Sequence, residues 1–159
     1  MSSEVDRGTT VTLYLPATDE EPAAQPAAQG AVERGFGQFV LVVEDERPLR
    51  RLAVTMLEKL GYRAVAAENG GSALMMVEDE GLRPDLVLTD VIMPGMRGGL
   101  LVKRLRKTIP GLRVVYMSGY TDDALKEDDV LEAGHFLQKP FSLAGLSAAV
   151  RAALEDRQT

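Results

Sequence analysis

Five polar residues that directly follow apolar runs could together handle a phosphoryl group: Glu44, Asp45, Asp90, Ser118 and Lys139. Carboxylates that lie close together repel one another unless a cation lies between them, and a hard, oxygen-binding ion such as Mg²⁺ suits such a set. An ionised Asp90 beside that ion could attack phosphorus. The ammonium of Lys139 and the hydroxyl of Ser118 are suited to stabilise the charge on the transferring group. This chemistry requires that folding brings the five residues together.

Five short apolar runs predict the strands that would position these residues. The runs are too apolar for a sheet with one solvated face, and strands covered on both faces are typical of parallel sheets. They lie at residues 39–43, 63–67, 85–89, 113–117 and 135–138. The first, third, fourth and fifth runs end in the polar residues named above. The second run ends in small residues.

Helical patterns separate these runs. The first helix has an apolar stripe of Leu49, Leu52, Ala53, Met56 and Leu60. We expect it to end at Gly61. Further helices are expected at residues 70–80, 98–107, about 122–131 and 142–155. The alternation predicts an α/β fold, a doubly wound five-stranded parallel sheet with five helices. In the flavodoxin-like strand order 2-1-3-4-5, strands one, three, four and five end on one connected rim, where such sheets bind ligands.

Four motifs resemble the receiver domain of two-component response regulators. They are "VVEDE", "LTDVIMPGM", "YMSGY" and "FLQKPF", in this order and at these spacings, and the resemblance covers about residues 38–155. It implies the receiver (βα)5 fold with Asp90 as the phosphoacceptor. It also implies that Glu44 and Asp45 form an acid pair for Mg²⁺, with Asp45 the more direct ligand and the backbone carbonyl of Ile92 a further one. Glu44 stands where many members have aspartate, so its metal contact could run through water.

The resemblance assigns roles near the ends of the last two strands as well. Ser118 and Lys139 would sense the phosphoryl group, Phe136 would be the switch aromatic, and the Lys139–Pro140 bond would be cis. We expect Phe136 to turn inward as Ser118 moves, which would alter the surface made by the fourth helix, fifth strand and fifth helix. The same surface is a candidate for homodimerisation.

The implied function is that of a phosphoacceptor in a phosphorelay. The chain would take a phosphoryl group from a phosphohistidine onto Asp90 with Mg²⁺, and would catalyse its own phosphorylation and dephosphorylation. The donor would be a histidine kinase core or a histidine phosphotransferase domain. The single histidine of the chain, His135, lies in the predicted fifth strand and has no phosphoacceptor helix around it. The donor must therefore lie on another polypeptide segment.

The chain divides into four expected regions. Residues 1–16 include "RGTTVTLYLP", where Val11, Leu13 and Leu15 alternate with polar residues as in a half-buried strand. This segment resembles the last strand of a histidine-kinase ATP-binding domain, which would make the parent a hybrid sensor kinase. Residues 17–37 are rich in Ala, Pro, Gln, Glu and Gly and predict a flexible linker. Residues 38–155 are the predicted receiver domain, and 156–159 are a tail.

Composition limits the partners. The formal charge of −6 and the pI near 4.9 argue against direct nucleic-acid binding, because phosphate backbones are bound mainly by concentrated Lys and Arg. The chain has no cysteine, which fits a reducing compartment. It also lacks an apolar run long enough to cross a bilayer and an N-terminal signal-peptide core. We therefore expect a cytoplasmic protein without direct membrane contact.

Three alternatives remain open at this point. A haloacid dehalogenase-type phosphatase would need a second acid two residues after the nucleophile, where this chain has Ile92. A flavodoxin-like cofactor binder would need a phosphate-binding loop after the first strand, where "EDE" would repel phosphate. The third alternative is a phosphorylation-independent interaction module that keeps the receiver fold. The complete acid set argues against it.

Overall fold

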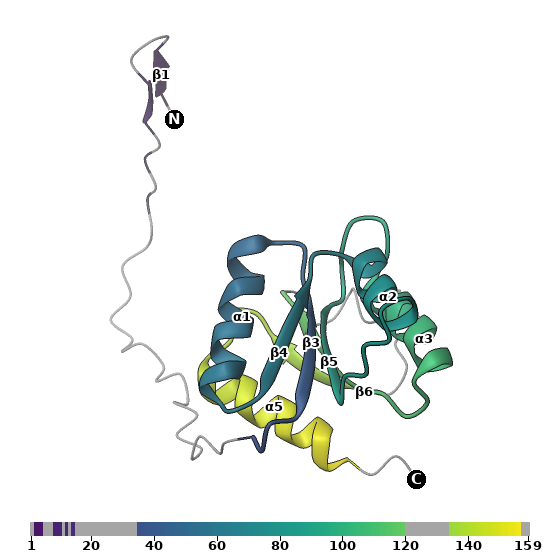
Figure 1. Cartoon of the computed structure of the whole chain (residues 1–159). Helices are drawn as coiled ribbons and strands as arrows, with labels where there is room; N and C mark the ends of the chain where they lie inside the picture. Colours follow the sequence, from purple (N-terminus) through teal and green to yellow (C-terminus); the bar gives the residue numbers. More distant parts are fainter. Residues whose placement is uncertain are drawn as a thin grey trace.

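The computed structural model describes residues 2–4, 8–10, 12, 14, 35–119 and 134–156. From residue 35 onward the described elements, in chain order, are β3 (Phe39–Val43), α1 (Arg47–Lys59), β4 (Arg63–Ala67), α2 (Gly70–Glu78), β5 (Leu86–Asp90), α3 (Gly98–Thr108), β6 (Arg113–Ser118), β7 (His135–Gln138) and α5 (Leu143–Glu155). The five strands pair in parallel in the order β4-β3-β5-β6-β7 (Figure 1). With β3 counted as the first strand, this is the predicted order 2-1-3-4-5. The helix expected at about 122–131 lies outside the described residues.

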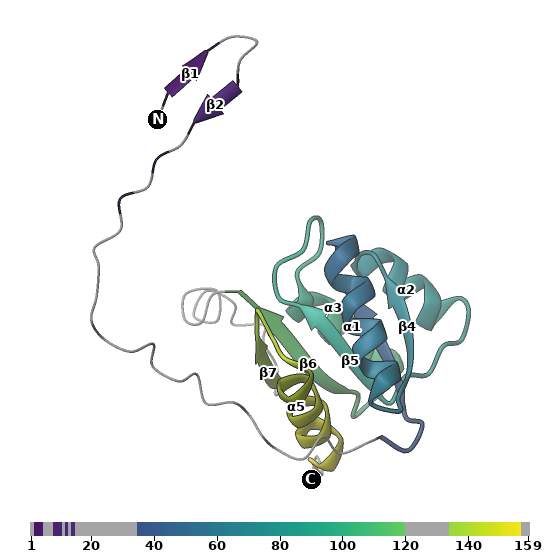
Figure 2. The ribbon, with the colours of Figure 1, turned by 90° about the vertical axis from the view of Figure 1, so that its left-hand side faces the viewer.

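Both faces of the sheet are covered by helices, as the apolar strands predict. Successive residues of β3 alternate between the faces: Val40 and Val42 pack with α1 and α5, whereas Leu41 and Val43 pack with α2 and α3. Figure 1 shows α1 and α5 apart from α2 and α3, and Figure 2 shows α5 beside β7. All four of these β3 side chains are completely buried, so the central strand has no solvated face.

Helix α1 ends where the sequence predicts, but its buried stripe is partly different. Gly61 has a φ of +86°, a left-handed conformation that favours glycine, and it follows the last turn of the helix. Ala53 and Leu57 are the buried residues of the helix, whereas Leu52 is 46% exposed. The inclusion of Leu52 in the stripe was therefore wrong. Leu57 lies four residues after Ala53 and continues its face, while Leu52 lies at the margin.

The register of the strands brings their carboxyl ends to one edge. Val43, the last residue of β3, pairs with Thr89, so Glu44 and Asp45 leave β3 beside the end of β5. Asp90 pairs with Met117 of β6. Ser118 pairs with Gln138, the residue before Lys139. The edge of the sheet predicted to carry the chemistry is thus assembled from four neighbouring strands.

The N-terminal residues that are described form a small hairpin of their own. Strands β1 (Ser2–Glu4) and β2 (Gly8–Thr10) pair antiparallel in a separate two-stranded sheet, labelled in Figure 2. Of the segment expected to form a half-buried strand, Val11, Leu13 and Leu15 lie outside the described residues. Thr12 and Tyr14 are described, and neither is in a strand. The described strand therefore ends before the alternating segment begins.

Residues 35–37, just before the predicted start of the domain at residue 38, are hydrogen-bonded to it. The backbone N–H of Gly35 donates to the carbonyl of Leu60 at 2.7 Å, and that of Gly37 donates to the carbonyl of Gly61 at 3.1 Å. Residues 35–37 are thus bonded to the turn after α1. In the described part of the chain, no helix has both the length and the apolar character needed to cross a membrane.

Candidate functional site

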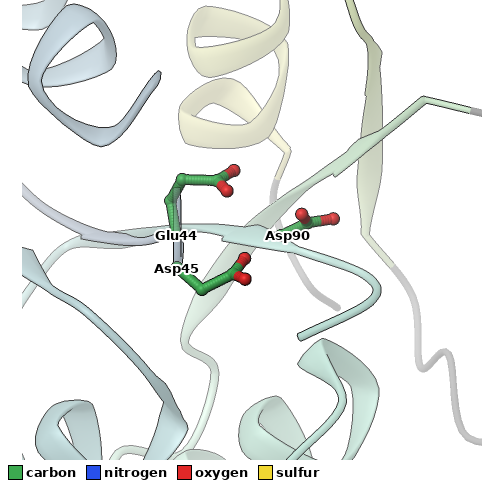
Figure 3. A group of neighbouring side chains, drawn as sticks. All are labelled: Glu44, Asp45 and Asp90. Atoms are coloured by element: carbon green, nitrogen blue, oxygen red, sulfur yellow. The ribbon is translucent and has the colours of Figure 1, made fainter. Parts of the chain in front are cut away.

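Three carboxylates from two neighbouring segments meet at the carboxyl edge of the sheet. Glu44 and Asp45 follow β3, and Asp90 ends β5. One carboxylate oxygen from each of the three lies within 4.8 Å of the others. Figure 3 shows the three side chains extending toward a common space. The convergence required for the predicted chemistry is therefore present for the acids.

Lys139 lies among these acids and contacts two of them. Its Nζ is 2.7 Å from Oε2 of Glu44 and 2.7 Å from Oδ2 of Asp90. The lysine reaches this position because the turn after β7 lies beside the end of β6, where the Lys139 N–H donates to the carbonyl of Ser118 at 2.7 Å. The Lys139–Pro140 peptide bond is cis, as predicted.

The charges at the site suit a divalent cation. Three ionised carboxylates and one ammonium leave two negative charges, which a single Mg²⁺ would neutralise. The donors are all oxygen atoms, which are the ligands that Mg²⁺ prefers. Glu44, Asp45 and Asp90 therefore fit a hard divalent ion in number, charge and donor type.

Burial and hydrogen bonding act in opposite directions on the ionisable groups of the site. Burial raises the pKa of Glu44, and the hydrogen bonds that it accepts from Lys139 and from the N–H of Glu46 only partly offset this effect. For Lys139, burial alone would lower the pKa, but its hydrogen bonds with Asp90 and Glu44 and the negative charges of both acids together outweigh burial, and the pKa is raised. Lys139 is therefore held as an ammonium between two acids.

Glu44 and Asp45 differ in how their side chains are held. Glu44 is 1% exposed, and its Oε1 accepts a hydrogen bond of 3.1 Å from the N–H of Glu46 while its Oε2 accepts one from Lys139. Asp45 is exposed, and within the described part of the chain its carboxylate accepts no hydrogen bond. Asp45 thus offers its oxygens to a ligand more readily than Glu44 does. The predicted division of roles in the acid pair stays a prediction.

The remaining predicted residues lie around this centre. The N–H of Ile92 donates to Oδ1 of Asp90 at 3.2 Å, and its side chain is 58% exposed. Ser118 ends β6, on the strand next to Asp90. Phe136 is 48% exposed, and its ring stacks on Tyr116 with centroids 5.5 Å apart. The structure therefore brings together the acids and the lysine, and it places Phe136 in an outward position.

Two features near the site were missed by the sequence analysis. A Cβ atom on Gly98 would lie 2.1 Å from the carbonyl oxygen of Asp90, so only glycine allows α3 to begin so close to Asp90. The Gly98 N–H also donates to the carbonyl of Val91 at 3.0 Å. The second feature is Glu68. It follows β4 directly and lines the same pocket as Asp45. The pair of glycines after the Pro-Gly break was the available signal for the first feature.

Comparison with known proteins agrees with this geometry. Residues 40–151 match the family described as the response regulator receiver domain. The sensor kinase CckA of Brucella abortus is 38% identical over 162 residues, which cover 96% of this chain and 17% of that protein. The sporulation initiation phosphotransferase F of Bacillus subtilis is 36% identical, over 73% of this chain and 93% of its own length.

Solved structures give the same result. The crystal structure of the receiver domain of the hybrid histidine kinase CckA superposes with a TM-score of 0.62 at 32% identity, covering 74% of this chain and 99% of that one. The chemotaxis protein CheY4 of Vibrio cholerae superposes with a TM-score of 0.67 at 26% identity, with the same coverage. The chain spans only about a sixth of the length of the sensor kinase that it matches.

Proposed function

The chain belongs to the family of response regulator receiver domains of two-component systems, and from this premise we propose that it accepts a phosphoryl group on Asp90. The observation that supports this assignment best is the contact of Asp90 with Lys139 at 2.7 Å within a cluster of three carboxylates. An aspartate that caps a turn would not require a partly buried ammonium and two further acids beside it.

The proposed reaction is transfer from a phosphohistidine to a carboxylate. An oxygen of Asp90 forms a bond to phosphorus, the bond between phosphorus and the histidine nitrogen breaks, and the imidazole keeps the electron pair. Glu44, Asp45 and Asp90, with the carbonyl of Ile92, would hold Mg²⁺. When bound, the ion would supply positive charge that offsets the negative charge of the phosphoryl oxygens. Lys139 already lies against Asp90, so its ammonium can pass to a phosphoryl oxygen while it remains bonded to Glu44.

The contact of Lys139 with Asp90 suggests how phosphorylation changes the protein surface near β7. Lys139 is joined to Ser118 through the backbone, and β6 and β7 are paired up to Ser118 and Gln138. We propose that Ser118 and Lys139 move toward the new phosphoryl oxygens and that Phe136 leaves Tyr116 and turns inward. This change would bias the surface of β7, α5 and the fourth helix expected at about 122–131, which is also the proposed surface for a homodimer.

The partners follow from the reaction and from the relatives. The donor is proposed to be a histidine kinase core or a histidine phosphotransferase domain. The similarity to the sensor kinase CckA extends over 96% of this chain and so includes residues outside the receiver match. This extent supports the proposal that residues 1–16 belong to the end of a kinase ATP-binding domain and that the parent is a hybrid kinase. A cytoplasmic location is part of the same proposal.

Labelling with acetyl phosphate and Mg²⁺ tests the proposed phosphoacceptor. We expect Asp90→Asn to abolish labelling, because the amide cannot act as the nucleophile. Asp85→Asn is the matched control: Asp85 precedes the same strand, and its carboxylate accepts a hydrogen bond from the N–H of Phe39 at 2.7 Å. This variant should label like the wild type. Full labelling of Asp90→Asn would contradict the proposal. If the chain bound a partner equally well in the Asp90→Asn variant and in the presence of beryllofluoride, the interaction-module alternative would be favoured.

A further inference from the structure

Arg50 of α1 contacts the backbone on both sides of Asp45. Its Nη1 donates to the carbonyl oxygen of Glu44 at 2.6 Å and to that of Asp45 at 2.9 Å. The first carbonyl belongs to the peptide plane that precedes the Cα of Asp45, and the second belongs to the plane that follows it. One guanidinium nitrogen therefore fixes both planes, and with them the direction in which the Asp45 side chain leaves the backbone.

This contact matters because the Asp45 carboxylate is not itself held, and only part of its backbone has another restraint: the Glu46 N–H, in the plane that follows Asp45, donates to Oε1 of Glu44 at 3.1 Å. The Glu44 carboxylate is held by Lys139 and by the N–H of Glu46. The Asp45 carboxylate is exposed and accepts no hydrogen bond in the described part of the chain. Its orientation toward Glu44 and Asp90 must therefore come from its backbone.

The start of α1 supplies no capping side chain for this turn, although Pro48 stands in its first turn. Glu46 is the N-cap residue, and its side chain makes no capping hydrogen bond. A capping side chain would normally fix the chain at this point. The backbone N–H of Arg50 donates to the carbonyl of Glu46 at 2.9 Å, so the same residue forms the first helical bond and the side-chain contact.

We propose that Arg50 is a positioning residue that orients Asp45 for the divalent cation, an inference that rests on the proposed function of the site. Groups that orient a metal ligand without touching the metal commonly change metal affinity by about 10- to 100-fold when they are removed. The positive charge of Arg50 acts in the opposite direction, because a cation near the site repels Mg²⁺. The sign of the change in affinity therefore separates the two roles.

The test is a calorimetric Mg²⁺ titration of the full chain and its variants. Arg50→Met removes both the contact and the charge, and we expect Mg²⁺ affinity to fall about 10-fold or more. Arg50→Lys keeps the charge, but its shorter side chain does not extend as far as Nη1 of Arg50, so it should also bind Mg²⁺ more weakly than the wild type. Tighter binding by Arg50→Met, or wild-type affinity in Arg50→Lys, would overturn the proposal.

The chain provides a matched control in Arg83. Its Nη1 donates to the carbonyls of Val77 and Leu82 at 2.8 and 2.9 Å, which is the same type of contact away from the acids. Arg83→Met should leave Mg²⁺ affinity unchanged within about twofold. A loss equal to that of Arg50→Met would show that the effect is general destabilisation.

A second measurement tests the contact without metal. In EDTA, amide hydrogen exchange at Glu46 should accelerate about 10-fold or more in Arg50→Met and remain unchanged in Arg83→Met. Unchanged exchange at Glu46 in Arg50→Met would contradict the positioning role. If the wild type bound no Mg²⁺, the proposed function would fail, and the exchange result would still decide whether Arg50 holds the turn.

Discussion

Strand β5 has an aspartate immediately before its first residue and another as its last residue, and the two carboxylates have different neighbours. Asp85 is exposed and accepts a hydrogen bond from the N–H of Phe39, so it joins the starts of β3 and β5. Asp90 is largely buried and lies against Lys139, Glu44 and Asp45. The two ends of one strand thus give an aspartate different surroundings, because other strands place charges beside Asp90 and a backbone N–H beside Asp85.

Removing the ammonium of Lys139 tests the difference between Asp90 and Asp85 most strongly, and it should have the largest effect on stability. Lys139→Met leaves Glu44 and Asp90 without a cation in the metal-free protein. Because Lys139 is partly exposed, we expect a loss of about 2–3 kcal/mol in the free energy of unfolding, below the range for fully buried pairs.

Urea unfolding in EDTA and in saturating Mg²⁺ measures this effect. The ion should stabilise Lys139→Met more than it stabilises the wild type, because it neutralises carboxylates that have lost their ammonium. Loss of Asp85 should show no such dependence on Mg²⁺. Equal stabilisation of wild type and Lys139→Met by the ion would contradict the assigned charge balance.

A second test acts on the backbone of Asp90 and leaves the charges in place. Gly98→Ala puts a Cβ atom against the carbonyl oxygen of Asp90, so α3 or the end of β5 must shift. We expect a loss of about 1–3 kcal/mol, as for other overpacked positions, together with slower phosphorylation.

Thermal unfolding and acetyl phosphate labelling check this prediction. The control is Gly145→Ala in α5, where the nearest side-chain atom would be 3.5 Å away and alanine favours the helix. Gly145→Ala should be neutral or slightly stabilising. Wild-type stability in Gly98→Ala would show that the close approach is not required.

The smallest expected effect is a change in the free energy of unfolding with pH that comes from Glu44. The pKa of Glu44 is raised in the folded protein, mainly by burial, so its contribution to stability is present at low pH and is lost as pH rises through the folded pKa. In EDTA, the Glu44→Gln variant should therefore gain stability relative to the wild type as pH rises above the ordinary glutamate range.

Denaturant unfolding from acid to neutral pH measures that difference, with Asp85→Asn as the reference substitution. In Mg²⁺ the gain of Glu44→Gln should shrink or reverse, because the ion favours the ionised carboxylate. A stability difference that is flat with pH in EDTA would show that burial of Glu44 has no such cost.

The sheet and the carboxyl-end rim were predictable because they depend on local patterns. Short apolar runs and the residues that follow them indicated the strands, and the flavodoxin-like order, taken from fold class, then predicted the convergence of the acids with Lys139. The exposed position of Leu52 was not predictable from spacing alone, since two adjacent apolar residues compete for one face of the helix.

The supporting contacts of the site depend on tertiary structure and left little trace in the sequence. Arg50 has the spacing of an ordinary solvated helix residue, and its contact with two carbonyls depends on how α1 leaves β3. Gly98 is one of several glycines, and its importance comes from the distance to Asp90. The outward position of Phe136 depends on its stacking with Tyr116 across two strands.

The two contacts of Lys139 also constrain the order in which the molecule assembles. They join residues separated by 95 and 49 positions along the chain. Such contacts form only after the intervening segments have been brought together, because closing long loops costs entropy before the contact is gained. The acids therefore gain the ammonium of Lys139 late in folding. In a nascent chain that has not yet formed β7, the carboxylates repel one another without this ammonium between them.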